Sequence, residues 1–274
     1  MQNSSYKKIL FSDIDETLVT TDKRLTDENR AAINEFLNAG NVLAVTTGRA
    51  LSGALNLIRT LELFSKRNTY LCAYNGAQIY DLFSGKTLYR KGLDTELVRQ
   101  VDQYAKEYGI HLQAYSDTAV LSESDNSNLR RYCSEQNLQF EIVPDLAFSL
   151  SVPTAKLLAI DFSNPEKVSA FSSLLRQKMG SQLNIFLSNE YLLEIVPNGI
   201  DKGFAVSFLA KELSVPIENT ISAGDQENDI PMIIAAGHGC AVSNGIQALK
   251  NAADYVTEHD NNHSAIAEIL RKFG

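Results

Sequence analysis

The chain has 274 residues, of which 44% are apolar, and its formal net charge at pH 7 is −8. This length favours two domains with sizeable buried cores. The negative charge and the scattered Lys and Arg residues exclude a nucleic-acid groove, which needs a basic stripe to displace counterions. No stretch approaches the ~18 consecutive apolar residues of a membrane span, and the three dispersed cysteines exclude a disulfide framework. We therefore expect a cytoplasmic enzyme or binding protein without nucleic-acid or membrane partners.

The first 80 residues alternate short apolar runs with amphipathic segments, which is typical of strands alternating with helices. Thr26 can cap one of these helices, and Gly40 can end it. The alternation predicts a parallel sheet with helices on both faces, in which ligands bind at the carboxyl ends of the strands. The expected strands are residues 8–12, 42–45 and 70–74, and the expected helices begin after residues 26 and 50.

The pattern changes between about residue 84 and residue 189. Shorter strands and helices follow one another here without the regular alternation of the first segment, which predicts an α+β arrangement with antiparallel strands solvated on one face. The predicted elements are a hairpin over residues 80–89, a helix over 97–108, a strand over 156–162 and a helix that begins at Asn164-Pro165.

The first pattern resumes after residue 190. We therefore predict an α/β fold, in which residues 1–83 and 190–274 form a Rossmann-like, doubly wound parallel sheet and residues 84–189 form an inserted α+β domain. The expected later strands are residues 192–196, 220–223, 239–242 and 255–257, with a helix over 202–213.

Two acid-rich segments each follow a predicted buried strand. Asp13 and Asp15 follow the first strand, and Asp225 and Asp229 follow the strand over residues 220–223. Taken alone, each segment could be a solvated loop or a turn, because Asp and Gly favour turns. Loops at one edge of a parallel sheet can instead converge on a single cation, and Mg²⁺ prefers oxygen ligands that include carboxylates. The two segments together therefore indicate a metal site.

Two further segments suit the binding of an anion. Thr47 and Gly48 offer a hydroxyl and a flexible backbone just before a helix N-terminus, where unpaired N–H groups bind anions. Lys202 lies in the first turn of a predicted helix, where a cation opposes the helix dipole and needs a local reason. A helix cap and a surface lysine are the alternative interpretations. A tight turn alone can explain Asn75-Gly76, and the four histidines have no metal-ligand spacing.

The order of these residues resembles the order of the sequence motifs in the haloacid dehalogenase superfamily. More narrowly, it is similar to that of the Cof-type phosphatases, whose α/β cap is inserted between the second and third motifs. The resemblance covers nearly the whole chain. Two positions depart from the family pattern: Glu16 stands where the family most often has glycine, and His263-Ser264 stands where it often has Asp-Gly. The matching motifs are Asp13-x-Asp15-x-Thr17, Thr47-Gly48-Arg49, Lys202 and Gly224-Asp225-x-x-Asn228-Asp229.

The resemblance implies a magnesium-dependent phosphatase that hydrolyses small phosphorylated metabolites, such as sugar phosphates, through an aspartyl-phosphate. Asp13 is then the nucleophile, and Asp15 is first the general acid and later the general base. The implied magnesium ligands are the carboxylates of Asp13 and Asp225 and the backbone carbonyl of Asp15. The inserted domain would close over the site. The implied phosphate ligands are Thr47, Gly48, Lys202 and Asn228, with Asp229 orienting its neighbours.

Two other functions are alternatives to a phosphatase. A phosphomutase of the same superfamily passes the phosphoryl group from the aspartate to a second hydroxyl, and isomerisation of the product would distinguish it. A non-catalytic sensor of a phosphorylated ligand is disfavoured, because both aspartates, the lysine and the metal-binding acid are all present.

Overall fold

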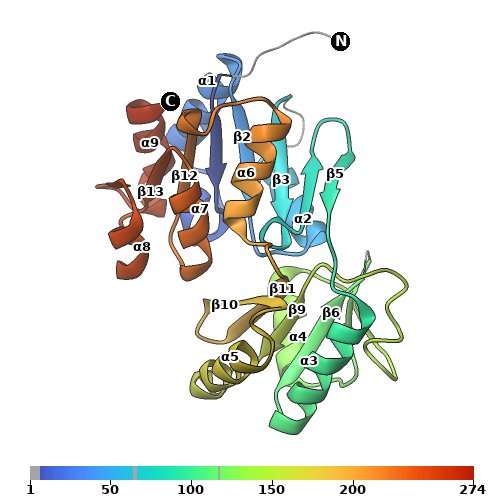
Figure 1. Ribbon diagram of the computed structural model, residues 1–274. Helices are drawn as coiled ribbons and strands as arrows, with labels where there is room; N and C mark the ends of the chain where they lie inside the picture. The colour runs from blue at the N-terminus through green and yellow to red at the C-terminus, as the bar shows by residue number, and fades with distance from the viewer. Residues whose placement is uncertain (1–6, 64–66, 117) are drawn as a thin grey trace.

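The structure is a computed structural model that describes residues 7–63, 67–116 and 118–274. It contains an eight-stranded and a six-stranded sheet, which form the upper and lower halves of Figure 1. In spatial order, the larger sheet consists of β14 (Tyr255–Val256), β13 (His238–Ala241), β12 (Thr220–Gly224), β1 (Ile9–Ser12), β2 (Val42–Thr46), β3 (Thr69–Ala73), β4 (Gln78–Asp81) and β5 (Lys86–Arg90). The smaller sheet consists of β10 (Leu183–Asn189), β11 (Leu192–Pro197), β9 (Leu157–Ile160), β6 (His111–Tyr115), β7 (Val120–Ser122) and β8 (Phe140–Ile142).

Two helices begin where the sequence predicts their caps, at Thr26 and Asn164, and a third has a cap at Asp201 that was not predicted. The side chains of Thr26, Asn164 and Asp201 each accept a hydrogen bond from a backbone N–H of the following first turn. Among the helices that the structure describes, none combines the length and the apolar composition needed to span a lipid bilayer. The helices are α1 (Asp27–Asn38), α2 (Leu51–Thr60), α3 (Thr95–Tyr108), α4 (Ser127–Gln136), α5 (Pro165–Met179), α6 (Lys202–Glu212), α7 (Ile230–Ala235), α8 (Gln247–Ala252) and α9 (Ala265–Phe273).

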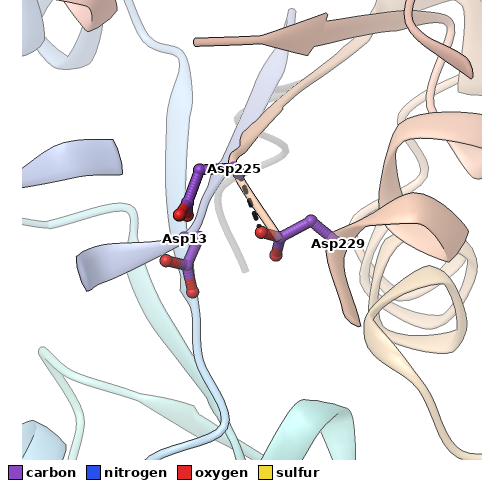
Figure 2. Close-up of side chains that lie close together, drawn as sticks. All are labelled: Asp13, Asp225 and Asp229. Carbon is purple, nitrogen blue, oxygen red and sulfur yellow. Dashed lines mark hydrogen bonds between the residues drawn. The ribbon is translucent and has the colours of Figure 1, made fainter. Parts of the chain in front are cut away.

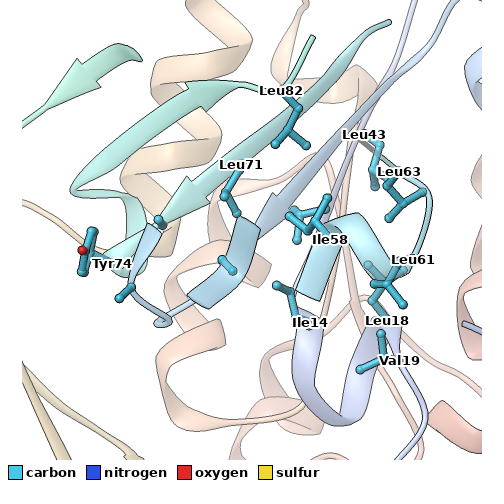
Figure 3. Close-up of a cluster of buried hydrophobic side chains, with 14 of the residues drawn as sticks. Ile14, Leu18, Val19, Leu43, Ile58, Leu61, Leu63, Leu71, Tyr74 and Leu82 are labelled. Carbon is cyan, nitrogen blue, oxygen red and sulfur yellow. The ribbon is translucent and has the colours of Figure 1, made fainter. Parts of the chain in front are cut away.

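Strand β1 lies in the middle of the larger sheet, parallel to β12 on one side and to β2 on the other. Its side chains alternate between two apolar layers. Ile9 and Phe11 pack on the face covered by α6, whereas Leu10 belongs to the opposite layer, which contains residues of α1, α2 and α9. Figure 3 shows part of that second layer, with Leu43 and Ile58 among its members. The predicted doubly wound sheet is therefore confirmed, and the antiparallel strands β4 and β5 extend it beyond β3.

The smaller sheet is antiparallel except for the parallel pair β7 and β8. Its central strand β9 is buried on both faces. Leu157 and Ala159 pack in a layer with residues of α3 and α5, whereas Leu158 and Ile160 face a layer that contains Leu129 of α4. The expected solvated face was therefore wrong for the centre of this sheet, because α4 covers the face that the helices α3 and α5 leave open.

The expected limits of the inserted segment, residues 84–189, do not coincide with the smaller sheet. Strand β5 pairs with β4 in the larger sheet, and β11 pairs with β10 and β9 in the smaller sheet. A short apolar run such as residues 192–196 is typical of any strand buried on both faces, so its composition does not indicate which sheet contains it. Sheet membership moves the limits to the loops that follow β5 and β11.

Candidate active site

The loops that follow β1, β12, β2 and β3 lie at the carboxyl edge of the larger sheet, as expected for ligand-binding loops. A cavity of about 550 Å³ lies between this edge and the smaller sheet. The residues that line it from the larger sheet include Asp13, Asp15, Thr47, Gly48, Asp225 and Asn228, and those from the smaller sheet and α4 include Tyr132, Gln136, Ser188, Asn189, Leu192 and Glu194.

Three buried carboxylates gather at the base of this cavity. Asp13, Asp225 and Asp229 each offer an oxygen, and these oxygens lie within 4.8 Å of one another (Figure 2). The Nζ of Lys202 lies 2.6 Å from Asp13 Oδ1 and 2.5 Å from Asp229 Oδ1. Lys202 is buried at the first position of α6, so it is not a surface lysine. The two carboxylates are the local reason for a cation that opposes the helix dipole.

The carboxylates outnumber the cation that contacts them. Burial raises the pKa of Asp13 well above its usual range, against the opposing charge of Lys202. Burial, together with the charge of Asp229, raises the pKa of Asp225 to about 7. Burial disfavours the charged form of Lys202, but Asp13 and Asp229 outweigh it and raise the lysine pKa. A divalent cation would supply the missing positive charge, and the all-oxygen donor set suits Mg²⁺.

Asp229 has both of its carboxylate oxygens engaged by the protein. Oδ1 contacts Lys202, while Oδ2 accepts hydrogen bonds from the backbone N–H groups of Asp225 and Gln226 at 2.9 and 3.0 Å. Gly224 permits this approach, because a Cβ there would lie 2.5 Å from the Cβ of Asp229. These contacts favour the expected role of Asp229 in orienting its neighbours.

The Asp15 side chain contacts two cations, Arg49 and Lys23. It accepts hydrogen bonds from Arg49 Nε and Nη2, both at 2.7 Å, and its Oδ1 lies 2.9 Å from Lys23 Nζ. Burial alone would raise the pKa of Asp15, but the hydrogen bonds and charges of Arg49 and Lys23 outweigh it and lower the pKa to about 2. Two acids close in sequence therefore occupy opposite electrostatic environments.

The two departures from the family pattern have a common backbone feature. Glu16 and Ser264 adopt left-handed conformations, with φ of 55° and 67°, which glycine adopts without steric cost. Contacts hold Glu16 in place: its carboxylate accepts hydrogen bonds from Thr21 Oγ1 and Asn261 Nδ2, at 2.8 and 3.1 Å. Ser264 Oγ lies 2.8 Å from Thr26 Oγ1. Both residues therefore fit the backbone that the family's glycines would allow.

The expected phosphate-binding residues lie around the same cavity. Thr47 and Gly48 follow β2, and Thr47 Oγ1 accepts a hydrogen bond from the backbone N–H of Arg49 at 3.1 Å. Asn228 Nδ2 donates to Asn75 Oδ1 at 3.1 Å. Asn75 therefore does more than form the tight turn proposed from its sequence, because its side chain contacts a residue of another loop.

Sequence reasoning missed two buried charged residues beside the cavity. Lys156 lies just before β9 and Glu194 lies within β11, and their Nζ and Oε2 atoms are 2.7 Å apart. A signal was present in the sequence, because each is a charged residue in or next to an apolar run. The four histidines, which all fall within the described ranges, lie outside the residues that line the cavity.

Comparison with known proteins gives a consistent assignment. A family model described as haloacid dehalogenase-like hydrolase matches residues 10–270. The solved structure of TM0651 from Thermotoga maritima is 30% identical, with a TM-score of 0.81 and 98% of each chain covered. A haloacid dehalogenase-like hydrolase from Bacteroides thetaiotaomicron is 26% identical, with a TM-score of 0.85, and covers 98% of this chain and 100% of that one. The curated 5-amino-6-(5-phospho-D-ribitylamino)uracil phosphatase YwtE of Bacillus subtilis is 26% identical, with 96% of each chain covered.

The family match includes both sheets and every loop around the cavity, so the similarity is not confined to a common core. Relatives at a similar level of identity are named as phosphatases. This enzyme belongs to the haloacid dehalogenase-like hydrolases.

Proposed function

We propose that this enzyme is a magnesium-dependent phosphatase that transfers the phosphoryl group of a small phosphomonoester to Asp13 and then to water. The observation that carries the proposal is the buried group of Asp13, Asp225 and Lys202 at the carboxyl edge of the parallel sheet. Phosphoryl transfer requires in-line positioning and neutralisation of the charge on the phosphoryl oxygens. A carboxylate nucleophile flanked by a lysine and by a second acid that can hold a cation supports this neutralisation of charge.

The residues present fit a magnesium ion. The carboxylates of Asp13 and Asp225 and the backbone carbonyl of Asp15 would hold it, because Asp229 already has both oxygens occupied. When bound, magnesium supplies positive charge between the nucleophile and the phosphate dianion, which would otherwise repel each other.

The side chains then divide the reaction between them. An Asp13 oxygen forms a bond to phosphorus while the bond between phosphorus and the leaving oxygen breaks, and Asp15 gives its proton to that oxygen. Lys202, with Thr47, Gly48 and Asn228, holds the phosphoryl oxygens. In the second half, the water oxygen forms a bond to phosphorus while Asp15 accepts its proton, and the bond between phosphorus and the Asp13 oxygen breaks to release inorganic phosphate.

The contacts of Asp15 define a condition on its acid role. Arg49 and Lys23 hold Asp15 as a carboxylate, which suits a base but not an acid. The contacts of Asp15 with Arg49 and Lys23 would therefore have to weaken before Asp15 can carry the proton that it donates. Arg49 lines the cavity, so an incoming substrate can contact the guanidinium directly.

The cavity supports a small polar substrate. Its lining from the smaller sheet and α4 is rich in polar side chains, among them Gln136, Ser188 and Asn189, which can bind hydroxyl or amide groups of a leaving group. Sugar phosphates fit this description. The relative YwtE is named for a phosphorylated ribitylamino compound, and a substrate of that kind also fits. The segment of the smaller sheet would act as a cap that shapes this pocket and excludes bulk water.

A phosphate-release screen over a panel of phosphomonoesters tests the proposal. We expect release with magnesium and none in excess EDTA, whereas full activity in EDTA would contradict the metal requirement. Isomerised product in place of free phosphate would instead indicate a phosphomutase.

A further inference from the structure

Lys156 and Glu194 form an ion pair that is almost completely buried. Their side chains are 1% and 5% exposed, whereas the Lys106–Asp102 and Arg131–Glu135 pairs of the same segment have more exposed cations. Glu194 lies in β11 and Lys156 lies just before the neighbouring strand β9, where Leu158 is opposite Glu194.

This pair contacts the loops of the other sheet. Lys156 Nζ donates to the backbone carbonyl of Gly48 at 2.6 Å, and Glu194 Oε2 accepts a hydrogen bond from Asn75 Nδ2 at 3.3 Å. Asn75 in turn accepts from Asn228 Nδ2, and its backbone N–H donates to the carbonyl of Thr47. A continuous set of hydrogen bonds therefore joins the smaller sheet to three loops around the cavity.

The approach between the pair and these loops is close. A Cβ on Gly48 would lie 3.2 Å from Glu194 Oε1 and 3.3 Å from Asn75 Nδ2, which is tighter than ordinary contact. Glycine at position 48 thus allows the charged pair and the loop to pack directly against each other. A shift of either charged side chain would move the Gly48 carbonyl or the Asn75 amide.

Stability alone is a weak explanation for this arrangement. Burial lowers the pKa of Lys156, although the charge of Glu194 opposes the change. Well-packed apolar residues of similar volume often replace a buried ion pair without loss of stability. The pair instead provides two directional contacts, one to each of two loops, which apolar side chains cannot provide.

We propose that Lys156 and Glu194 are positioning residues that fix the Thr47-Gly48 loop and the Asn75 and Asn228 amides for binding of the phosphoryl group. The smaller sheet thereby contributes to phosphate binding as well as to the pocket for the leaving group. This inference rests on the proposed phosphatase function. It requires that loss of the pair weakens binding of the phosphoryl group itself, whichever leaving group is attached.

Binding of inorganic phosphate to the full-length chain in the presence of magnesium tests this directly, because phosphate carries no leaving group. Calorimetric titration and thermal unfolding would be measured for the wild type, Glu194→Gln, Lys156→Met and the double variant Lys156→Met/Glu194→Leu. Leu157→Ala is the matched control, since Leu157 is the next residue after Lys156 and is also buried, but packs toward α3 and α5. It destabilises the smaller sheet without contacting the loops.

We expect both single variants to bind phosphate about tenfold more weakly, the size of effect produced by the loss of one or two hydrogen bonds. Leu157→Ala should unfold at a lower temperature but bind phosphate within about twofold of the wild type. The double variant should unfold at a higher temperature than either single variant, because it leaves no unpaired buried charge, yet its phosphate affinity should stay low.

Recovery of phosphate affinity in the double variant would overturn the inference, as would wild-type affinity in both single variants. Weakening that follows unfolding temperature across all variants, Leu157→Ala included, would also overturn it by showing a purely structural role. A wild-type enzyme that neither binds nor releases phosphate would instead refute the proposed function, and the inference with it.

Discussion

Two parts of the cavity contain acids in opposite electrostatic environments: the floor, formed by Asp13, Asp225, Asp229 and Lys202, and the wall, formed by Asp15, Arg49 and Lys23. On the floor, Asp13 and Asp229 contact Lys202, Asp225 lies close to both acids, and burial raises the pKa values of Asp13 and Asp225. On the wall, Arg49 and Lys23 contact the carboxylate of Asp15 and lower its pKa to about 2. The floor has one cation for three carboxylates, a deficit that a bound metal ion can offset, whereas two cations contact Asp15 on the wall. Neighbouring charges, rather than residue type, separate the roles that we propose for these acids.

The largest expected effect comes from replacing the nucleophile on the floor. Asp13→Asn keeps the size of the side chain but removes the oxygen nucleophile's charge, so no phosphoenzyme can form. We expect turnover of every substrate to fall by more than about 10⁴-fold, measured as phosphate release. An unchanged circular dichroism spectrum would serve as the folding control. Residual turnover near the wild-type rate would exclude Asp13 as the nucleophile.

A smaller effect is expected when the metal-holding acid on the floor is neutralised. Asp225→Asn should raise the magnesium concentration for half-maximal activity by more than about tenfold. Mutating even a residue that only hydrogen-bonds to a metal ligand lowers metal affinity by ~10–100-fold. Asp225→Asn should also lower kcat. Magnesium titration of activity measures both effects, and an unchanged titration curve would show that Asp225 is not a ligand.

The raised pKa of Asp225 predicts a pH dependence of metal binding in the wild type. Below a pKa of about 7 the metal-free carboxyl is protonated, and a protonated acid must release its proton before it binds a cation. The magnesium requirement should therefore rise as the pH falls from 8 to 6, by up to about tenfold per pH unit below the pKa. Titrations at pH 8, 7 and 6 test this, and equal requirements at the three pH values would contradict it.

Loss of Arg49 from the wall should shift the pH dependence of kcat. Arg49 lowers the pKa of Asp15, so Arg49→Ala should raise that pKa. Because the base role needs the ionised carboxylate, the acidic limb of the kcat profile should move to higher pH. Lys23→Met is a useful comparison and should produce a smaller shift, since Lys23 is 41% exposed while Arg49 is 13% exposed. An acidic limb at the same pH in Arg49→Ala would show that kcat does not depend on the ionisation of Asp15.

Local signals were sufficient to predict much of the fold and that residues from several loops gather at one edge of the larger sheet. The caps at Thr26 and Asn164 depend on residues close in sequence, and the structure confirms both. The parallel sheet follows from alternating strands and helices, and parallel strands bring their carboxyl ends to one edge. Asp13 and Asp225 could therefore be placed near each other although more than two hundred residues separate them in the sequence.

The features that could not be predicted depend on contacts between distant segments. Nothing near Asp15 in the sequence indicates that Arg49 forms two hydrogen bonds with it. The pairing of Lys156 with Glu194 likewise requires β9 and β11 to be neighbours, and an apolar run alone does not tell which sheet contains β11. Patterns of burial predict strands, but partners between strands are set by tertiary packing.

Detection of the phosphoenzyme tests the central claim most directly, because Asp13 should carry the phosphoryl group whereas Asp15 should only assist its transfer. Asp15→Asn should still allow Asp13 to be phosphorylated by an aryl phosphate, whose leaving group needs little proton donation. Hydrolysis of the phosphoenzyme should slow by ~10²–10⁴-fold without a base. Intact-mass measurement after acid quench should then detect a phosphoryl adduct on Asp15→Asn that maps to Asp13 and is absent from the double variant Asp13→Asn/Asp15→Asn. An adduct on any other residue, or one that persists in the double variant, would contradict the account.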